Sequence, residues 1–153
     1  MTGTIPAGES TAMRALVIFE SLTGNTRKAA LSIAEQLRGA GWDASVSSSR
    51  QVDLAALQRA DVLIVGTWVD GALIIGQRLG GRGRLAKLPL LGGKPTFGFV
   101  TYAIDPGKTL DKLTTALEER GADVRGAMTI RRDLLDEATT DFVDRLLSAS
   151  TTV

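Results

Sequence analysis

The fold is decided by the stretch Ala15-Leu-Val-Ile-Phe-Glu-Ser21-Leu-Thr-Gly-Asn-Thr26. Residues 15–19 are a continuous apolar run, which is typical of a strand buried on both faces of a parallel sheet. From Asn25 to Arg38, apolar residues recur at helical spacing, and Gly39 and Gly41 follow as a stop signal. The stretch therefore predicts a buried strand, a tight glycine-containing loop and a helix.

The same alternation continues along the rest of the chain. Further strands are expected at 43–47, 61–66, 94–101 and 123–130, and further helices at 54–58, 109–120 and 133–149. Because parallel strands need crossover connections, this order predicts a doubly wound α/β fold with three layers, in which helices cover both faces of an open sheet. Residues 67–93 show poor periodicity and are expected to be irregular, and a long loop after a central strand is more often functional than idle.

Length and composition limit the organisation and the chemistry. A chain of 153 residues with 44 % hydrophobic side chains can bury one core, so we expect one domain at 13–150 after a disordered tail at 1–12. The chain has no histidine and no cysteine, which excludes thiolate metal sites, cysteine nucleophiles and Ser-His pairs. We therefore predict no catalytic side chain and no metal site.

Charge and hydropathy limit the partners. The 18 basic and 17 acidic residues nearly balance, which argues against a dominant attraction to nucleic acid. No apolar run approaches the roughly 20 residues that span a bilayer. The absence of cysteine fits a reducing compartment, so a cytoplasmic location is expected.

The loop after the first strand has the chemistry of a phosphate cradle. Ser21, Thr23 and Thr26 offer hydroxyl groups, Gly24 permits a tight turn with inward N–H groups, and the helix contributes the positive end of its dipole. The alternative is an ordinary turn with a helix cap, since the same residue types favour both. The spacing of the hydroxyls between a buried strand and a helix favours phosphate binding.

The loop at 21–26 resembles the FMN-phosphate loop of the flavodoxin family, which has the pattern Ser/Thr-x-Thr-Gly-Asn-Thr. The resemblance extends over residues 14–149 in the order of strands and helices, in the shorter form that lacks an insertion in the last strand. It implies a flavodoxin-like fold, with a five-stranded parallel sheet of order 2-1-3-4-5 and FMN at its carboxyl edge. It also implies that the phosphate is bound by Ser21, Leu22, Thr23, Gly24, Asn25 and Thr26.

Two later loops resemble the flavin loops of the same family. The loop after the third strand carries a Thr-Trp pair followed by glycine, which implies that Trp68 stacks on the isoalloxazine; the alternative is that Trp68 packs beneath a loop. The loop after the fourth strand matches by position only and implies contacts through backbone groups. The residues assigned to the flavin in these loops are Thr67, Trp68, Val69, Asp70, Gly71, Thr101, Tyr102, Ala103 and Gly107.

A basic segment interrupts the otherwise balanced charge. Residues 71–104 contain no Asp or Glu. The segment is either a solvated loop or a docking surface for an acidic redox partner protein, a quinone head group or the phosphate of NAD(P)H. Its cations are Arg78, Arg82, Arg84, Lys87 and Lys94.

These observations predict an FMN-binding electron-transfer shuttle. The alternatives are a small FMN-dependent NAD(P)H or quinone oxidoreductase, including one like the flavodoxin-like protoporphyrinogen oxidases, and a flavin-free binding or regulatory module. A receiver domain is disfavoured because it needs an acidic cluster after the first strand and a phosphoacceptor Asp after the third. Since the net charge is +1 and electron-carrier flavodoxins are typically acidic, we expect a less negative potential for forming the anionic reduced flavin.

Overall fold

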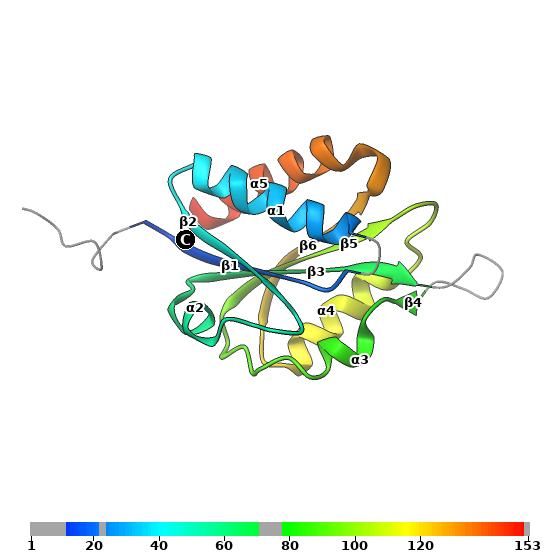
Figure 1. Ribbon diagram of the computed structural model, residues 1–153, viewed down its shortest axis with the longest axis horizontal. Helices are drawn as coiled ribbons and strands as arrows, with labels where there is room; N and C mark the ends of the chain where they lie inside the picture. The colour runs from blue at the N-terminus through cyan, green and yellow to red at the C-terminus, as the bar shows by residue number, and fades with distance from the viewer. Residues whose placement is uncertain (1–11, 22–23, 71–77, 152–153) are drawn as a thin grey trace, which may run out of the picture.

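The computed structural model describes residues 12–21, 24–70 and 78–151. Its centre is a parallel sheet in the order β2-β1-β3-β5-β6, which confirms the predicted order of five parallel strands (Figure 1). The strands are β1 (Arg14–Phe19), β2 (Asp43–Ser48), β3 (Val62–Asp70), β5 (Pro95–Tyr102) and β6 (Asp123–Arg131). The short strand β4 (Arg78–Leu79) pairs antiparallel with the end of β3.

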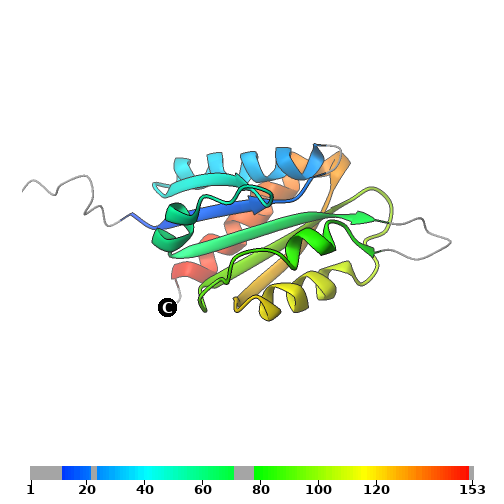
Figure 2. The ribbon, with the colours of Figure 1, turned by 60° about the horizontal axis from the view of Figure 1, so that its bottom comes forward.

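Helices cover both faces of the sheet, as the predicted three layers require. One face carries α1 (Asn25–Gly39) and α5 (Leu135–Thr151), which follows the short 3-10 turn η2 (Arg132–Leu134). The other face carries α2 (Leu54–Arg59), α3 (Arg82–Leu85) and α4 (Thr109–Glu119), as Figure 2 shows. No helix in the described ranges is long and apolar enough to cross a membrane.

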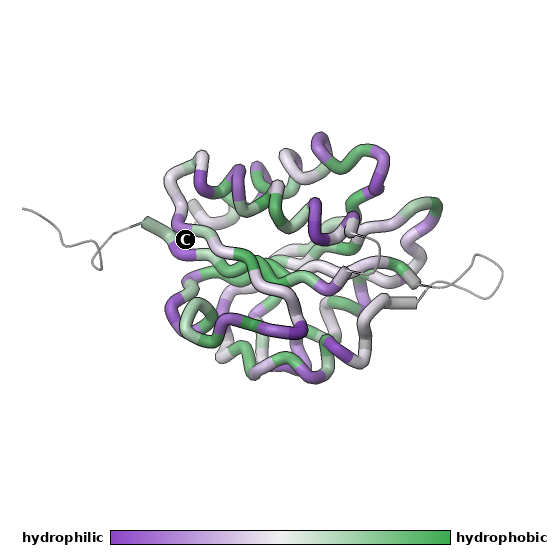
Figure 3. The backbone as a smooth tube through the Cα atoms, in the orientation of Figure 1, coloured by the Kyte–Doolittle hydropathy of each residue, from purple (hydrophilic) through white to green (hydrophobic). Residues whose placement is uncertain are grey.

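Alternation along the strands produces an apolar layer on each side of the sheet. Val17 pairs in register with Ile64, and both contribute to the core beneath α1 and α5. Leu16 pairs with Leu63, and both contribute to the core beneath α2, α3 and α4. Figure 3 shows this pattern as apolar strands enclosed by mixed and polar surface segments. The sheet is thus buried on both faces, as the apolar run in β1 predicted.

The expectation that 67–93 is irregular was wrong for much of the segment. Strand β3 continues to Asp70 and forms a hairpin with β4, and α3 follows directly. After α3, Leu88 and Leu91 continue a row that begins with Leu85, and all three side chains are buried in the core beneath α2, α3 and α4. The row has a three-residue spacing, but only three members, and a proline and a further leucine stand between the last two.

Apart from the end of β3, which lies at Asp70 and not at residue 66, the other predicted elements lie within two residues of the observed bounds. The domain bounds 13–150 stay a prediction; the first strand, β1, begins at Arg14 and the last helix, α5, ends at Thr151. Residues 1–11 of the expected tail lie outside the described residues.

Candidate cofactor site

The loops assigned to a cofactor converge at the carboxyl edge of the sheet. Because β1, β3 and β5 run parallel, the loops that follow them meet at one edge, which lies to the right in Figure 1. Most of the predicted site residues are therefore brought together there, although they are far apart in the sequence. Leu22, Thr23 and Gly71 lie outside the described residues, so their assignments stay predictions.

The start of α1 fits an anionic group. Gly24 adopts φ 99°, in the left-handed region that favours glycine, and its N–H donates to the Ser21 hydroxyl at 3.0 Å. Among the described residues no side chain caps the helix, and no described atom lies within 4 Å of where a Cβ on Gly24 would stand. No described side chain therefore competes for the positive end of the α1 dipole, and the Ser21 hydroxyl, which accepts from Gly24, keeps its own proton for a second partner.

Thr26 lies deeper than the sequence suggested. Its side chain is only 1 % exposed, and its Oγ1 lies 2.8 Å from the Oγ1 of Thr101 on β5. Thr101 is itself 3 % exposed, so its side chain belongs to the interior of the edge and not to its surface. The sequence assigned both residues to the cofactor but gave no signal that their hydroxyl groups meet, because 75 residues separate them.

Trp68 stands near the end of β3 with one face of its indole covered. A Cβ on Gly80 would lie 2.3 Å from both Cδ2 and Cε2 of Trp68. These two atoms form the bond shared by the two indole rings, so a point equally close to both lies over the ring face. Gly80 also donates its N–H to the Trp68 carbonyl at 2.7 Å and accepts from the Thr67 hydroxyl at 2.5 Å. Trp68 is half-buried, and the opposite ring face is the one that stacking on a flavin would use.

The neighbouring residues of the hairpin have distinct places. Val69 packs against the core beneath α2, α3 and α4, and pairs in register with Leu79. Asp70 is the last residue of β3 and pairs with Arg78. The flavin-assigned residues 67–70 therefore lie on a strand of this hairpin and not in an irregular loop.

The loop after β5 presents apolar groups at the same edge. Tyr102 is half-buried and pairs in register with Arg131 on β6, while Ala103 is exposed. Ile104 is 74 % exposed, so its side chain is accessible to a ligand at this edge. A turn closes the loop, in which the Gly107 N–H donates to Asp105 Oδ1 at 2.9 Å. An apolar ring that packs on this loop would remove hydrocarbon from water.

Charges near the edge are mostly paired. Glu20, directly after β1, is 3 % exposed, accepts from the Ser49 hydroxyl, and lies 3.5 Å from the Arg50 guanidinium. On the exposed surface, the two hydrogen bonds between Arg131 and Asp133 raise the pKa of the arginine and lower the pKa of the carboxyl group. The buried carboxylate of Glu20 therefore does not act as an uncompensated negative charge beside the site.

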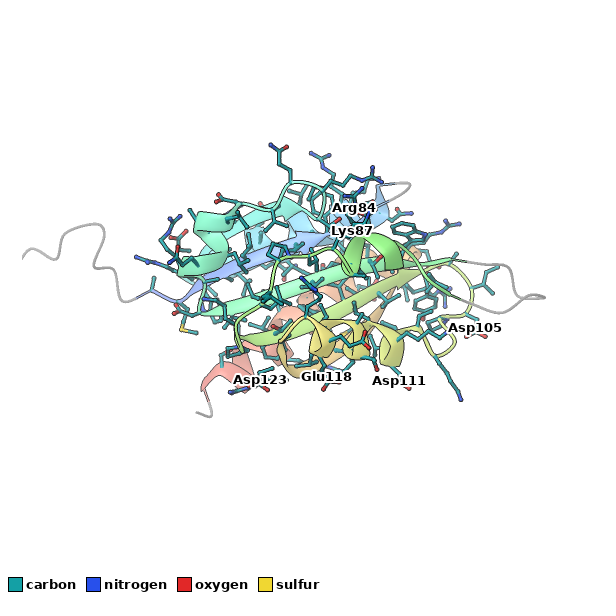
Figure 4. The ribbon with its side chains drawn as sticks, turned by 90° about the horizontal axis from the view of Figure 1, so that it is seen from below. Arg84, Lys87, Asp105, Asp111, Glu118 and Asp123 are labelled. Carbon is teal, nitrogen blue, oxygen red and sulfur yellow. The ribbon has the colours of Figure 1, made fainter. Side chains whose placement is uncertain are left out.

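The structure divides the predicted basic segment. Arg84 on α3 and the exposed Lys87 lie on the face that carries α4, as Figure 4 shows. Lys94 does not belong with them, because its ammonium group donates to the carbonyls of Gln58 at 3.0 Å and Ala60 at 2.6 Å, where α2 ends. This position precedes β5, at the amino edge of the sheet. Arg78 and Arg82 contribute described backbone only, so the predicted role of their side chains is outside the described structure.

Comparisons with known proteins agree with the fold. The sequence matches the model of the flavodoxin domain over residues 16–120. No match was found among curated proteins. Among solved structures, flavodoxin from Megasphaera elsdenii is similar with a TM-score of 0.61 and 22 % identity, covering 82 % of this chain and 98 % of that one.

Two further flavodoxin structures give the same result. Flavodoxin from Streptococcus pneumoniae has a TM-score of 0.58 and 23 % identity, over 86 % of this chain and 98 % of that chain. A point mutant of flavodoxin from Pseudomonas aeruginosa has a TM-score of 0.65 and 14 % identity, over 90 % and 98 %. These structures share the fold along nearly their whole length, and the resemblance expected from the sequence is confirmed.

Proposed function

This chain belongs to the flavodoxin domain family, and from that premise we propose that it is a shuttle that carries electrons between redox proteins. It is an FMN-binding, flavodoxin-like redox protein. When bound, FMN accepts and donates electrons one or two at a time. The observation that carries the proposal is the start of α1 at the carboxyl edge of the sheet, where Gly24 adopts φ 99° and no described side chain caps the helix, which suits an anion.

We assign the phosphate of FMN to the loop at 21–26. The first-turn N–H groups of α1 and the hydroxyl groups of Ser21, Thr23 and Thr26 would donate to its oxygens. Trp68 and Tyr102, with the exposed Ile104 beside them, would pack on the ring and exclude water. The full set of proposed contacts is Ser21, Leu22, Thr23, Gly24, Asn25, Thr26, Thr67, Trp68, Val69, Asp70, Gly71, Thr101, Tyr102, Ala103 and Gly107.

The two tryptophans of the chain provide a test of this assignment. Trp68 lies at the proposed ring site, whereas Trp42 packs at the far end of α1, where β2 begins. Titrating apoprotein with FMN should quench the flavin fluorescence, and Trp68→Phe should reduce the affinity while Trp42→Phe leaves it unchanged. Equal affinities for both variants would contradict the stacking role of Trp68. No bound FMN at micromolar excess would contradict the site as a whole.

A docking surface for an acidic partner is proposed at Arg84 and Lys87. Both cations lie on the segment that begins at Gly81, which passes so close to Glu20 at the end of β1 that a Cβ there would reach 2.3 Å from the glutamate Cγ. This contact supports a position beside the carboxyl edge, where the flavin would be. Arg78 and Arg82 remain candidates from the sequence, and Lys94 is left out because it is bound at the end of α2.

Small oxidants test this surface without a known partner. Oxidation of the reduced protein by ferricyanide, an anion, should slow as ionic strength rises, because salt screens the attraction. Lys87→Glu should lower the rate at low salt and weaken its salt dependence. Arg59→Glu makes the same charge change at the C-terminal end of α2 and should have little effect. A rate that responds equally to both variants would contradict local docking at Lys87.

The enzyme alternative predicts a different assay result. A shuttle needs only an accessible flavin edge, and the chain has no histidine or cysteine to serve a substrate reaction. We therefore expect no consumption of NADH or NADPH with a quinone as acceptor unless a separate reductase is added, and no oxidation of a porphyrinogen with a quinone as acceptor. Direct, saturable NAD(P)H consumption would favour an oxidoreductase. The cytoplasmic location stays a prediction that the absence of cysteine supports.

A further inference from the structure

Three buried threonines form a chain of hydrogen bonds across the carboxyl edge. Thr26 at the start of α1, Thr101 near the end of β5 and Thr67 near the end of β3 are 1 %, 3 % and 0 % exposed. The Oγ1 atoms of Thr26 and Thr101 are 2.8 Å apart, and Thr101 Oγ1 lies 3.4 Å from the Thr67 carbonyl. The Thr67 hydroxyl donates to the Gly80 carbonyl at 2.5 Å. The chain therefore joins the phosphate loop to the hairpin that holds Trp68.

The donor and the acceptor in each of these hydrogen bonds depend on where each hydroxyl proton points. A threonine hydroxyl has one proton to donate and can accept from other donors. The proton of Thr67 is committed to Gly80. The proton of Thr101 can go to Thr26 at 2.8 Å, within the usual range for O–H···O, or to the Thr67 carbonyl at 3.4 Å, beyond it.

The two arrangements leave Thr26 in different states. If Thr101 donates to the Thr67 carbonyl, Thr26 donates to Thr101 and has no proton for any other group. If Thr101 donates to Thr26, it forms the shorter of its two possible hydrogen bonds. The Thr26 proton then needs an acceptor other than these three threonines. A buried donor without an acceptor is unfavourable, so this second arrangement requires an acceptor at the loop.

We propose that Thr101 is a positioning residue that makes Thr26 a donor to the phosphate of FMN. The inference rests on the proposed function, which places that phosphate at 21–26. A phosphate oxygen accepts the Thr26 proton, and the Thr26 oxygen in turn accepts from Thr101, so that the two hydrogen bonds polarise and strengthen each other. Thr101 thereby contributes to the preference for FMN over riboflavin without touching either ligand through its hydroxyl.

The experiment compares FMN with riboflavin, which has no phosphate. Dissociation constants are measured by fluorescence quenching for wild-type apoprotein, Thr101→Val and Thr101→Ser. Valine keeps the branched shape but removes the hydroxyl, whereas serine keeps it. We expect Thr101→Val to weaken FMN binding about tenfold, because the hydrogen bond from Thr26 to the charged phosphate is weakened. The dissociation constant for riboflavin should be nearly unchanged. Thr101→Ser should restore most of the preference.

The outcomes separate this inference from the proposed function. Wild-type protein that binds both ligands equally would overturn the phosphate assignment and the inference with it. A wild-type preference for FMN that persists in Thr101→Val would overturn the inference alone, as would equal weakening of both ligands, which indicates a merely structural role. If the valine variant does not fold, Thr101→Cys gives the same comparison, because a thiol is a weaker donor and should reduce the preference to an intermediate value.

Discussion

Two glycines at the carboxyl edge act through their missing Cβ in different ways. Gly24 is needed for its backbone angle, since φ 99° is strained for other residues even though the space beside it is open within the described structure. Gly80 is needed for its small size, because the indole of Trp68 occupies the place of a side chain. One residue thus opens the proposed phosphate site, and the other supports the proposed ring site.

Gly80→Ala should destabilise the protein by about 1–3 kcal/mol, because the new methyl group overlaps the Trp68 indole and the ring must move. Urea unfolding monitored by tryptophan fluorescence measures the effect. Gly83→Ala is the control, since a Cβ there meets no described atom within 4 Å and alanine favours the α3 helix. If both alanine variants have wild-type stability and emission, Gly80 does not restrain the indole.

Gly24→Ala should cost about 1–2 kcal/mol in the free energy of unfolding, as expected for a non-glycine residue held at positive φ. If the turn relaxes to avoid this strain, FMN affinity should fall. Gly39→Ala is the matched control at the other end of α1, where a Cβ would contact none of the described atoms within 4 Å. Unchanged stability and FMN binding in Gly24→Ala would mean that the loop does not need the left-handed turn.

At the scale of elements, α2 depends on contacts outside itself. It has six residues, too few for a helix that is stable alone. The Asp53 carboxylate accepts from the Ala56 N–H at 3.0 Å at one end, and the Lys94 ammonium binds two carbonyls at the other. These polar contacts and the buried Ala56 and Leu57 hold the helix on the sheet.

Asp53→Ala should destabilise the protein by about 1 kcal/mol, because it removes the N-cap acceptor of α2. Asp53→Ser retains an acceptor and should lose much less. Chemical denaturation of the three proteins gives the comparison. A serine variant as unstable as the alanine variant would show that the charge of Asp53, and not its cap, supports this region.

At the scale of the whole molecule, α3 with the residues after it and α4 lie on the same face of the sheet but carry side chains of opposite charge. Figure 4 shows Arg84 and Lys87 on the segment of α3, and Asp111 and Glu118 on α4. The net charge of the sequence is +1. We expect this charge distribution to affect both docking and redox potential.

Redox titration tests this effect on the bound flavin. We expect a less negative potential for forming the anionic reduced flavin than strongly acidic flavodoxins have, because nearby cations stabilise negative charge. Lys87→Glu should shift the potential to a more negative value, and high salt should reduce the difference. A strongly low potential in the wild-type protein would show that its basic residues do not act on the flavin.

Local sequence patterns were enough to predict the alternation of strands and helices, the parallel sheet and a tight loop at 21–26. These features depend on local patterns: an apolar run such as residues 15–19 reports burial on both faces, and a glycine between hydroxyl residues before a helix reports a tight turn. Local patterns did not predict the structure at 67–93, because a hairpin forms there in which Val69 pairs with Leu79, ten residues later in the sequence.

Which side chains contact one another follows from the three-dimensional arrangement of the elements and could not be predicted from the sequence. Thr26 and Thr101 share a hydrogen bond across 75 residues, Gly80 covers Trp68, and Lys94 binds the end of α2 and leaves the basic surface. The first contact depends on the parallel strands, which bring distant loops to one edge, and the second on the antiparallel pairing of β3 with β4. The third depends on the path of the chain from α3 to β5, which places Lys94 at the opposite edge. A sequence pattern shows which interactions a residue type can form, whereas the folded sheet determines which distant residue is its partner.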